Sequence, residues 1–253
     1  KSVDFKLDSE LISIGHEAFA HSTLESIFVP SKVKELKDGC FLHMLNLNSI
    51  SISSENSLLS FLDKKFIVGK SDVNLQDFDL LIYAKSDVKE AFIPLHIKRI
   101  ASYAFYQCKY LKIINFEINS ELKIIDKYSF YQTPIEAISI PNKVYSINEF
   151  AFADCKYLKS VTFAHDSQLC LIEKNAFANS SVKKICIPST LNQISEYSFF
   201  DCKNLKSVKF TEKSQLKIIG RFAFAHSTLK NIIIPSTVKS IGENCFYKCK
   251  RLK

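Results

Sequence analysis

The chain has 253 residues, of which 47% are hydrophobic and 24% charged, and its 34 Lys and Arg against 26 Asp and Glu give a net charge of +8. This composition excludes a disordered chain, and with 5 Gly and 6 Pro it also excludes a collagen-like or flexible-linker chain. No stretch approaches the ~18 consecutive apolar residues of a membrane span. The chain opens Lys1-Ser2-Val3 without Met or an apolar signal region, so we expect any targeting segment to have been removed or to lie elsewhere.

Phenylalanine recurs along the whole chain at two alternating spacings. The steps are 22 and 25 residues, except for one step of 39 residues between Phe66 and Phe105. The repeated phenylalanines are Phe19, Phe41, Phe66, Phe105, Phe130, Phe152, Phe177, Phe199, Phe224 and Phe246. One coil of 22 to 25 residues cannot bury its own apolar face, so stacked coils must share a continuous core. Residues 1–253 are therefore predicted to form a single solenoid of ten half-repeats.

Prolines and cysteines repeat with the sum of the two steps, 47 residues. They are Pro94, Pro141, Pro188 and Pro235, and Cys108, Cys155, Cys202 and Cys249. Each of these prolines ends a phrase such as Leu229-x-x-Ile232-x-Ile234-Pro235, whose period-two, β-branched end predicts a short strand. Proline ends the strand because it has no N–H to donate to a ladder.

The long step contains an insertion of 17 residues, 67–83. Residues 80–84 are predicted to form an extra strand, and the insertion is predicted to be a hairpin packed against the solenoid. The alternative is that Asp72, Asp77 and Asp79 gather a cation, although they lack the spacing of a calcium loop.

Both ends of the chain lie at the same phase of the repeat. Terminal repeats of solenoids normally become polar caps, and neither end does so. We therefore expect this chain to be a fragment of a longer array.

The phrase Leu-x-x-Ile-x-Ile-Pro-x-x-Val-x-x-Ile-x4-Phe-x2-Cys, which recurs about ten times in register, resembles the BspA-like (Treponema pallidum-type) leucine-rich repeats. The repeats are rich in Lys, Ile and Phe, and in this composition they are similar to surface antigens of Trichomonas-like protists. The resemblance implies a β-rich leucine-rich-repeat solenoid, α/β in the sense used for such repeats, with a parallel sheet on its concave face and short helical or 3-10 turns and loops on its convex face. It also implies surface display, adhesion and binding of host proteins.

The repeated phenylalanines and cysteines are interpreted as core. Cys108, Cys155, Cys202 and Cys249 occur two coils apart, ~10 Å, which is too far for a disulfide, so we expect four buried thiols. No Cys-x-x-Cys, dinucleotide or P-loop motif occurs. The sequence therefore predicts no enzyme, no cofactor and no metal site.

The outward-facing residue of each predicted strand is the candidate ligand-binding row. Its candidate members are Phe28, Phe92, Asn115, Ser139, Thr162, Lys209 and Ile233. A face of mostly small residues can receive a protein or peptide, and the alternative is a merely solvated sheet face. Phe28 and Phe92 are expected two coils apart on one face, unless the insertion covers Phe92.

Lysines form further rows along the stack. Lys89, Lys112, Lys159, Lys183, Lys206, Lys230 and Lys253 follow the first strand residue, and Lys109, Lys156, Lys203 and Lys250 follow the repeated Cys. These rows either bind a sulfated glycan or another anionic surface, or form a solvated edge. Only three residues are Arg and aromatic interleaving is sparse, so nucleic acid is not expected as a partner.

Two classes of function remain open. The resemblance favours a non-enzymatic module at the cell surface or secreted, which binds a host or matrix protein, with self-association as a further possibility. The alternative is an intracellular scaffold for protein interactions. Contact with a membrane is expected only through a segment outside this chain.

Overall fold

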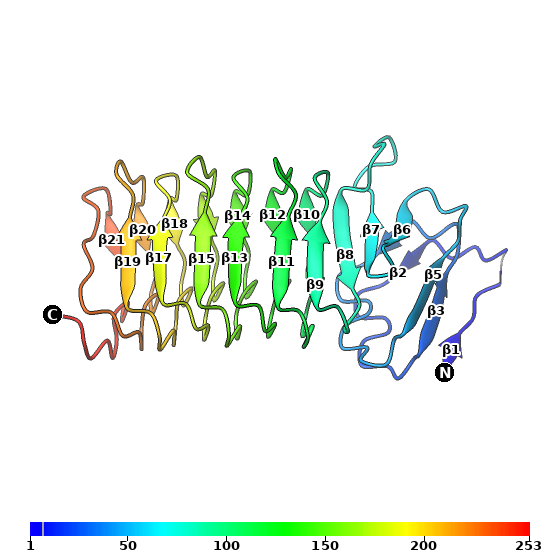
Figure 1. Ribbon diagram of the computed structural model, residues 1–253, viewed down its shortest axis with the longest axis horizontal. Coiled ribbons are helices and arrows are strands. Elements are labelled where there is room, and N and C mark those ends of the chain that lie inside the picture. The colour runs from blue at the N-terminus through cyan, green and yellow to red at the C-terminus, as the bar shows by residue number, and fades with distance from the viewer. Residues whose placement is uncertain (7) are drawn as a thin grey trace.

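The computed structural model describes residues 1–6 and 8–253 and has the form of an elongated solenoid of about ten turns (Figure 1). Each regular coil has three sides in a fixed order: a strand of the main sheet, a shorter strand of a second sheet, and a turn that holds one repeated phenylalanine. The predicted repeat solenoid is confirmed.

The main sheet is parallel and falls into three sections, β1-β3-β5, β9-β11 and β13-β15-β17-β19. The bounds of its strands are β1 Ser2–Val3, β3 Ser26–Val29, β5 Ser49–Ile52, β9 Glu90–Ile93, β11 Ile113–Phe116, β13 Ala137–Ile140, β15 Ser160–Phe163, β17 Lys184–Ile187 and β19 Ser207–Phe210. As predicted, strands end directly before Pro94, Pro141 and Pro188. Alternate side chains point inward, so β9 reads exposed, buried, exposed, buried.

The second sheet consists of two-residue strands that each end with an apolar residue, which is Ile in every strand except for Leu36. They are β2 Ser13–Ile14, β4 Glu35–Leu36, β10 Arg99–Ile100, β12 Ile124–Ile125, β14 Ser146–Ile147, β16 Leu171–Ile172, β18 Gln193–Ile194, β20 Ile218–Ile219 and β21 Ser240–Ile241. The strands from β10 to β21 pair in parallel, one coil after the next. A strand of two residues is too short to show a period-two pattern, so the sequence predicts only the main sheet.

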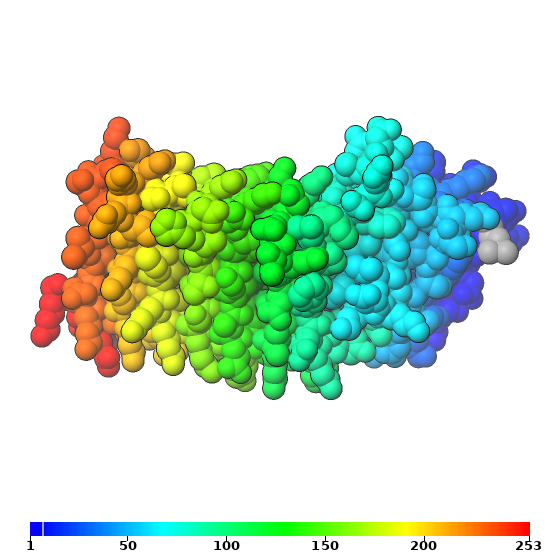
Figure 2. All heavy atoms as spheres, turned by 45° about the horizontal axis from the view of Figure 1, so that its top comes forward, coloured from blue at the N-terminus to red at the C-terminus, as the bar shows by residue number. Residues whose placement is uncertain are grey.

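An antiparallel meander interrupts the regular coils. It consists of β6 Leu59–Leu62, β7 Phe66–Gly69 and β8 Leu80–Ala84, so the strand predicted over 80–84 is present. Strand β8 also pairs in parallel with β10, which joins the meander to the second sheet. The loop 70–79 rises above the neighbouring coils (Figures 1 and 2). Phe66 lies in β7 and not in a turn, so it does not continue the row of turn phenylalanines.

The meander divides the core into two clusters. All four residues of β7 are buried. Since successive side chains of a strand point to opposite faces, Phe66 and Val68 enter the large C-terminal cluster while Ile67 enters the smaller N-terminal one. Strand β7 therefore lies between the two clusters and contributes side chains to both.

The third side of each coil has no helix, so the expected helical or 3-10 turns are wrong for the part of the chain that the structure describes. The residues two before and two after each turn phenylalanine have positive φ, for example Tyr103 at 63° and Gln107 at 52°. Left-handed residues interrupt a right-handed helix. The backbone instead bonds to the next coil: the N–H of Phe105 donates to the Ser129 carbonyl at 2.8 Å.

The turn phenylalanines stack along the axis as predicted. From Phe105 to Phe246, successive rings are near-parallel with centroids 4.9 to 5.8 Å apart. Phe152, Phe177 and Phe199 are fully buried. At the meander this stack is broken, because Phe41 meets Tyr83 edge-on at 5.4 Å and Phe66 meets Phe105 edge-on at 6.0 Å.

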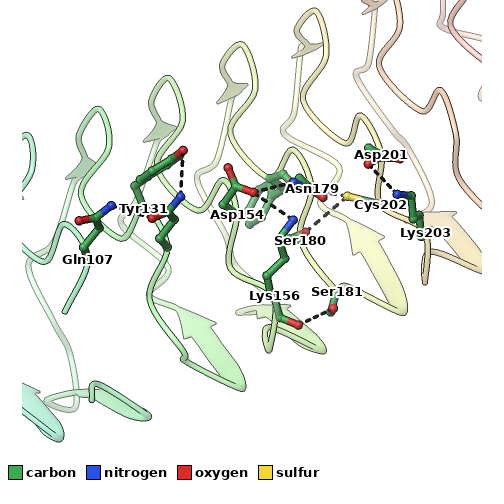
Figure 3. Close-up of polar contacts among 12 residues, drawn as sticks. Gln107, Tyr131, Asp154, Lys156, Asn179, Ser180, Ser181, Asp201, Cys202 and Lys203 are labelled. Carbon is green, nitrogen blue, oxygen red and sulfur yellow. Dashed lines mark hydrogen bonds and ion pairs between the residues drawn. The ribbon is translucent and has the colours of Figure 1, made fainter. Parts of the chain in front are cut away.

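The repeated cysteines join each coil to the previous one without covalent bonds. All eight cysteines are free; Cys108, Cys155 and Cys202 are buried as predicted, whereas Cys249 is half-buried. The Cys155 thiol donates to the Phe130 carbonyl at 3.0 Å and lies 3.4 Å from the Thr133 hydroxyl. Cys202 repeats this arrangement with Ser180, as Figure 3 shows. Each of these thiols therefore provides a hydrogen-bond partner for a carbonyl and a hydroxyl that stacking of the coils buries.

We expect Phe177→Ala to lower the free energy of unfolding by about 3–5 kcal/mol, because it removes a fully buried ring from the middle of the stack. Urea unfolding followed by circular dichroism measures the loss. The control is Ile118→Ala, at a side chain that is 85% exposed, which should change stability by less than about 0.5 kcal/mol. Equal losses in the two variants would contradict the central place of the stack.

We expect stability to fall above pH 9 through the buried thiols. Burial raises the pKa of Cys155 from 9.0 to about 12 and that of Cys202 from 9.0 to about 11. Below pH 9 these thiols are protonated in both states, but above it only the unfolded chain ionises, so each thiol weakens folding by up to about 1.4 kcal/mol per pH unit. Urea unfolding at pH 8 and 10 should therefore show a smaller drop for Cys155→Ala/Cys202→Ala than for the parent chain. Parallel drops would contradict this origin of the pH dependence.

Candidate functional site

The face of the main sheet that points away from the core carries the predicted ligand-binding row. The paired strands bring its members side by side: Phe92 lies opposite Asn115, and Ser139 opposite Thr162. Lys209 lies opposite the exposed Cys186. Every member of the predicted row is exposed except Phe28, which is half-buried. The row is thus an accessible line along the solenoid.

Three row members meet in one hollow of about 650 Å³, the first hollow, on β11, β13 and β15. Asn115, Ser139 and Thr162 form part of its lining. Carboxylates lie at its edge: Glu117 accepts a hydrogen bond from the Leu95 backbone N–H at 2.8 Å. Asp166 likewise accepts one from the Asn142 side chain at 2.7 Å. The sequence-based row did not include these acidic groups, which lie beyond the strand ends.

Two other row members meet in a second hollow of about 550 Å³ beside β19. Lys209 and Lys213 give it positive charge, and Ile233, 87% exposed, gives it an apolar wall. The segment 231–234, predicted as a strand, does not form one in the structure. The two hollows therefore differ in charge although they repeat the same fold.

Phe28 and Phe92, expected two coils apart on one face, lie in separate sections of the main sheet. Phe28 belongs to β3 in the β1-β3-β5 section, and Phe92 belongs to β9 in the β9-β11 section. The meander takes the place of the regular coil that would have joined the sections. It does not cover Phe92 either, since this ring is 58% exposed.

Aromatic side chains on the turns form two clusters that the sequence analysis does not single out. They occupy the positions two before and one after the turn phenylalanine, except for His226, which lies two residues after Phe224. The first cluster is Tyr103, Tyr106, Tyr128, Tyr131 and Phe150, and the second is Tyr197, Phe200, Phe222, His226 and Tyr247. These positions can be recognised in the sequence when the half-repeats are aligned on the turn phenylalanine. Their rings stack on one another, as Tyr128 does on Phe150 at 4.7 Å, so their faces are largely occupied within the cluster.

Polar side chains continue along the same turns (Figure 3). Asn179 donates to Asp154 at 2.5 Å, and Lys156 forms an ion pair with the same carboxylate at 3.0 Å. Burial first, and the Asp154 charge second, raise the pKa of Tyr131 to about 12. These groups meet one another's hydrogen-bonding and charge requirements. Their arrangement is not that of a nucleophile beside a general base.

Within residues 1–6 and 8–253, no group of three or more His, Cys, Asp or Glu side chains is placed to hold a metal ion. Asp79, one of the suggested cation ligands, accepts hydrogen bonds from the Ser71 backbone N–H and hydroxyl at 2.8 and 2.6 Å. No helix long and apolar enough to cross a membrane occurs in these residues.

Comparison with known proteins identifies the repeats. A family model described as a BspA-type leucine-rich repeat region matches residues 1–70, 76–168 and 123–253, with six copies. A leucine-rich repeat protein from Eubacterium ventriosum is 26% identical with a TM-score of 0.78, over 96% of this chain and 64% of that structure. Another, from Bacteroides ovatus, is 22% identical with a TM-score of 0.58, over 100% of this chain and 61% of that structure. The chain thus spans less than two thirds of the length of either of these proteins. No curated protein matches it.

Separate substitutions distinguish the two phenylalanines of the row. Phe28→Ser should lower the free energy of unfolding by about 1 kcal/mol, because the ring is half-buried and burying a whole Phe is worth roughly 1.5–3 kcal/mol. Phe92→Ser should stay within about 0.5 kcal/mol of the parent chain. Urea unfolding of both variants checks this difference, and equal losses would mean that Phe92 is also part of a core.

Proposed function

Because the chain belongs to the family of BspA-type leucine-rich repeats, we propose that it is a cell-surface recognition module that binds a protein partner on the exposed face of its main sheet. Repeats of this family are typical of surface antigens and of protein binding, and leucine-rich-repeat proteins are generally non-enzymatic. A host cell-surface or matrix protein is the partner class that we propose.

One observation carries the proposal: the outward row of the main sheet lines an open hollow. Asn115, Ser139 and Thr162 present small polar side chains on a rigid sheet, so a partner can approach the backbone closely. The hollow of about 650 Å³ is large enough to receive side chains of a partner. The acidic edge at Glu117 and Asp166 favours a partner with basic residues there.

We expect Ser139→Arg/Thr162→Arg to reduce partner capture at least tenfold, because two long cationic side chains fill the first hollow. The control is Asn192→Arg/Ser240→Arg, which adds the same charge at exposed positions at the second sheet. Capture is measured by immobilising each chain, adding labelled host surface and matrix proteins, and quantifying each protein retained. Light scattering on the chain alone measures self-association.

Equal retention by both double variants would contradict binding at the first hollow. Self-association that is lost only in the first variant would replace the foreign partner by a second copy of this chain. Thermal unfolding of all three chains shows whether the variants are folded.

A further inference from the structure

Charge is distributed unequally along the solenoid. Residues 151–253 contain 17 Lys and Arg against 7 Asp and Glu, whereas residues 1–150 contain 17 against 19. The C-terminal coils therefore carry a net charge of +10, and the remainder carries −2. A field of one sign over part of a molecule attracts ligands of the opposite sign.

The strongest line of positive charge lies directly before the main-sheet strands β15, β17 and β19 and continues at the equivalent positions of the two coils that follow. It is formed by one lysine per coil over five consecutive coils, which we name the lysine strip: Lys159, Lys183, Lys206, Lys230 and Lys253. The backbone holds the strip in register. The N–H of Lys183 donates to the Lys159 carbonyl at 3.1 Å, and that of Lys206 to the Lys183 carbonyl at 2.9 Å. Neighbouring ammonium groups thus start from backbones that are ~4.8 Å apart.

The central lysines of the strip have no acidic partner. All five are exposed. Lys159 pairs with Glu136 at 3.1 Å, but Lys183, Lys206 and Lys230 form no ion pair with any residue that the structure describes. The outward positions of β15, β17 and β19 also carry no acidic residue and add Lys184 and Lys209. Like charges at this spacing repel one another, so an anion that bridges several coils relieves that repulsion.

We propose that the lysine strip binds a linear sulfated polysaccharide laid along the solenoid axis. Such a chain carries anionic groups along its length and on several sides, so it can meet a straight row of ammonium groups without a fixed register. Lysine provides a compact, hydrated charge for such contacts and does not require the planar geometry of Arg.

Other polyanions fit the strip less well. An extended acidic peptide presents side chains on one face only every ~6.6 Å, which drifts out of phase with ~4.8 Å coils. Single-stranded nucleic acid is read by successive aromatic rings, and among the positions two residues before a strip lysine only Tyr157 is an exposed aromatic side chain. A flat anionic membrane would be contacted by several rows, whereas the lysines of the strip form one line.

The test compares two triple variants with equal loss of charge. The strip variant is Lys183→Gln/Lys206→Gln/Lys230→Gln. The dispersed variant is Lys34→Gln/Lys123→Gln/Lys217→Gln, at exposed lysines next to the second sheet that form no ion pair with the residues described. Binding to immobilised heparin is measured over a series of salt concentrations, with thermal unfolding to verify that both variants are folded.

We expect the strip variant to lose at least about tenfold in affinity for heparin, and the slope of log affinity against log salt to fall by about two to three, since each lost contact removes about one unit. The dispersed variant should lose no more than about twofold. Desulfated heparin should bind weakly to every chain.

Equal losses in the two variants would overturn the proposal, because net charge alone would then explain binding. So would absence of heparin binding, or equal binding of desulfated heparin. Tighter binding to poly-glutamate, or to vesicles of phosphatidylserine and phosphatidylcholine in equal parts, would assign the strip to an acidic protein segment or to a membrane instead. The inference does not depend on the protein partner proposed above, because the Ser139→Arg/Thr162→Arg variant leaves the strip unchanged.

Discussion

The stacking of one phenylalanine on the next, held in register by the backbone of the turns, is the constraint on which this solenoid depends. The ring of Phe152 lies 5.2 Å from that of Phe177, and the N–H of Phe152 donates to the Ala176 carbonyl at 2.7 Å. Both contacts require the next coil to follow at one spacing. The positive-φ residues on either side of the ring make this possible, since they turn alternate N–H groups toward the neighbouring coil and not into a helix. The rows on the two sheets then fall into register as a consequence.

The meander shows how the fold accommodates a break in that constraint. Where the phenylalanine stack stops, β7 supplies a fully buried strand whose alternate side chains complete one core on each side. The buried Asn56 closes the adjoining coil: its side chain donates to the Pro30 and Val33 carbonyls and accepts from the Leu58 and Leu59 N–H groups. The row of repeated cysteines is interrupted in the same region. Met44 stands where a thiol would lie, and the Ser22 hydroxyl is left buried without a partner in the part of the chain that the structure describes.

Because every coil repeats the same geometry, differences in surface chemistry arise only from the side chains at outward positions. The same strand position gives small polar groups in the first hollow and Lys209 with Ile233 in the second. The position before the strand is Glu25, Asn48 or Glu136 in three of the earlier coils and lysine in each of the last five. One scaffold thus offers an uncharged to acidic surface and a basic surface to different ligands.

The sequence by itself determines the solenoid, the inward and outward residues of the main strands, the buried phenylalanine row and the free thiols, because each follows from a period that recurs many times. Asn115, Ser139 and Thr162 can be placed on one face in this way. Only the tertiary structure decides what depends on non-repeated contacts. It places Phe66 in a wall between two cores, separates Phe28 from Phe92, and adds Glu117 and Asp166 to the first hollow. It also replaces the expected helical turns by left-handed turns, since the bonds that fix them are made to the next coil and leave no local pattern in the sequence.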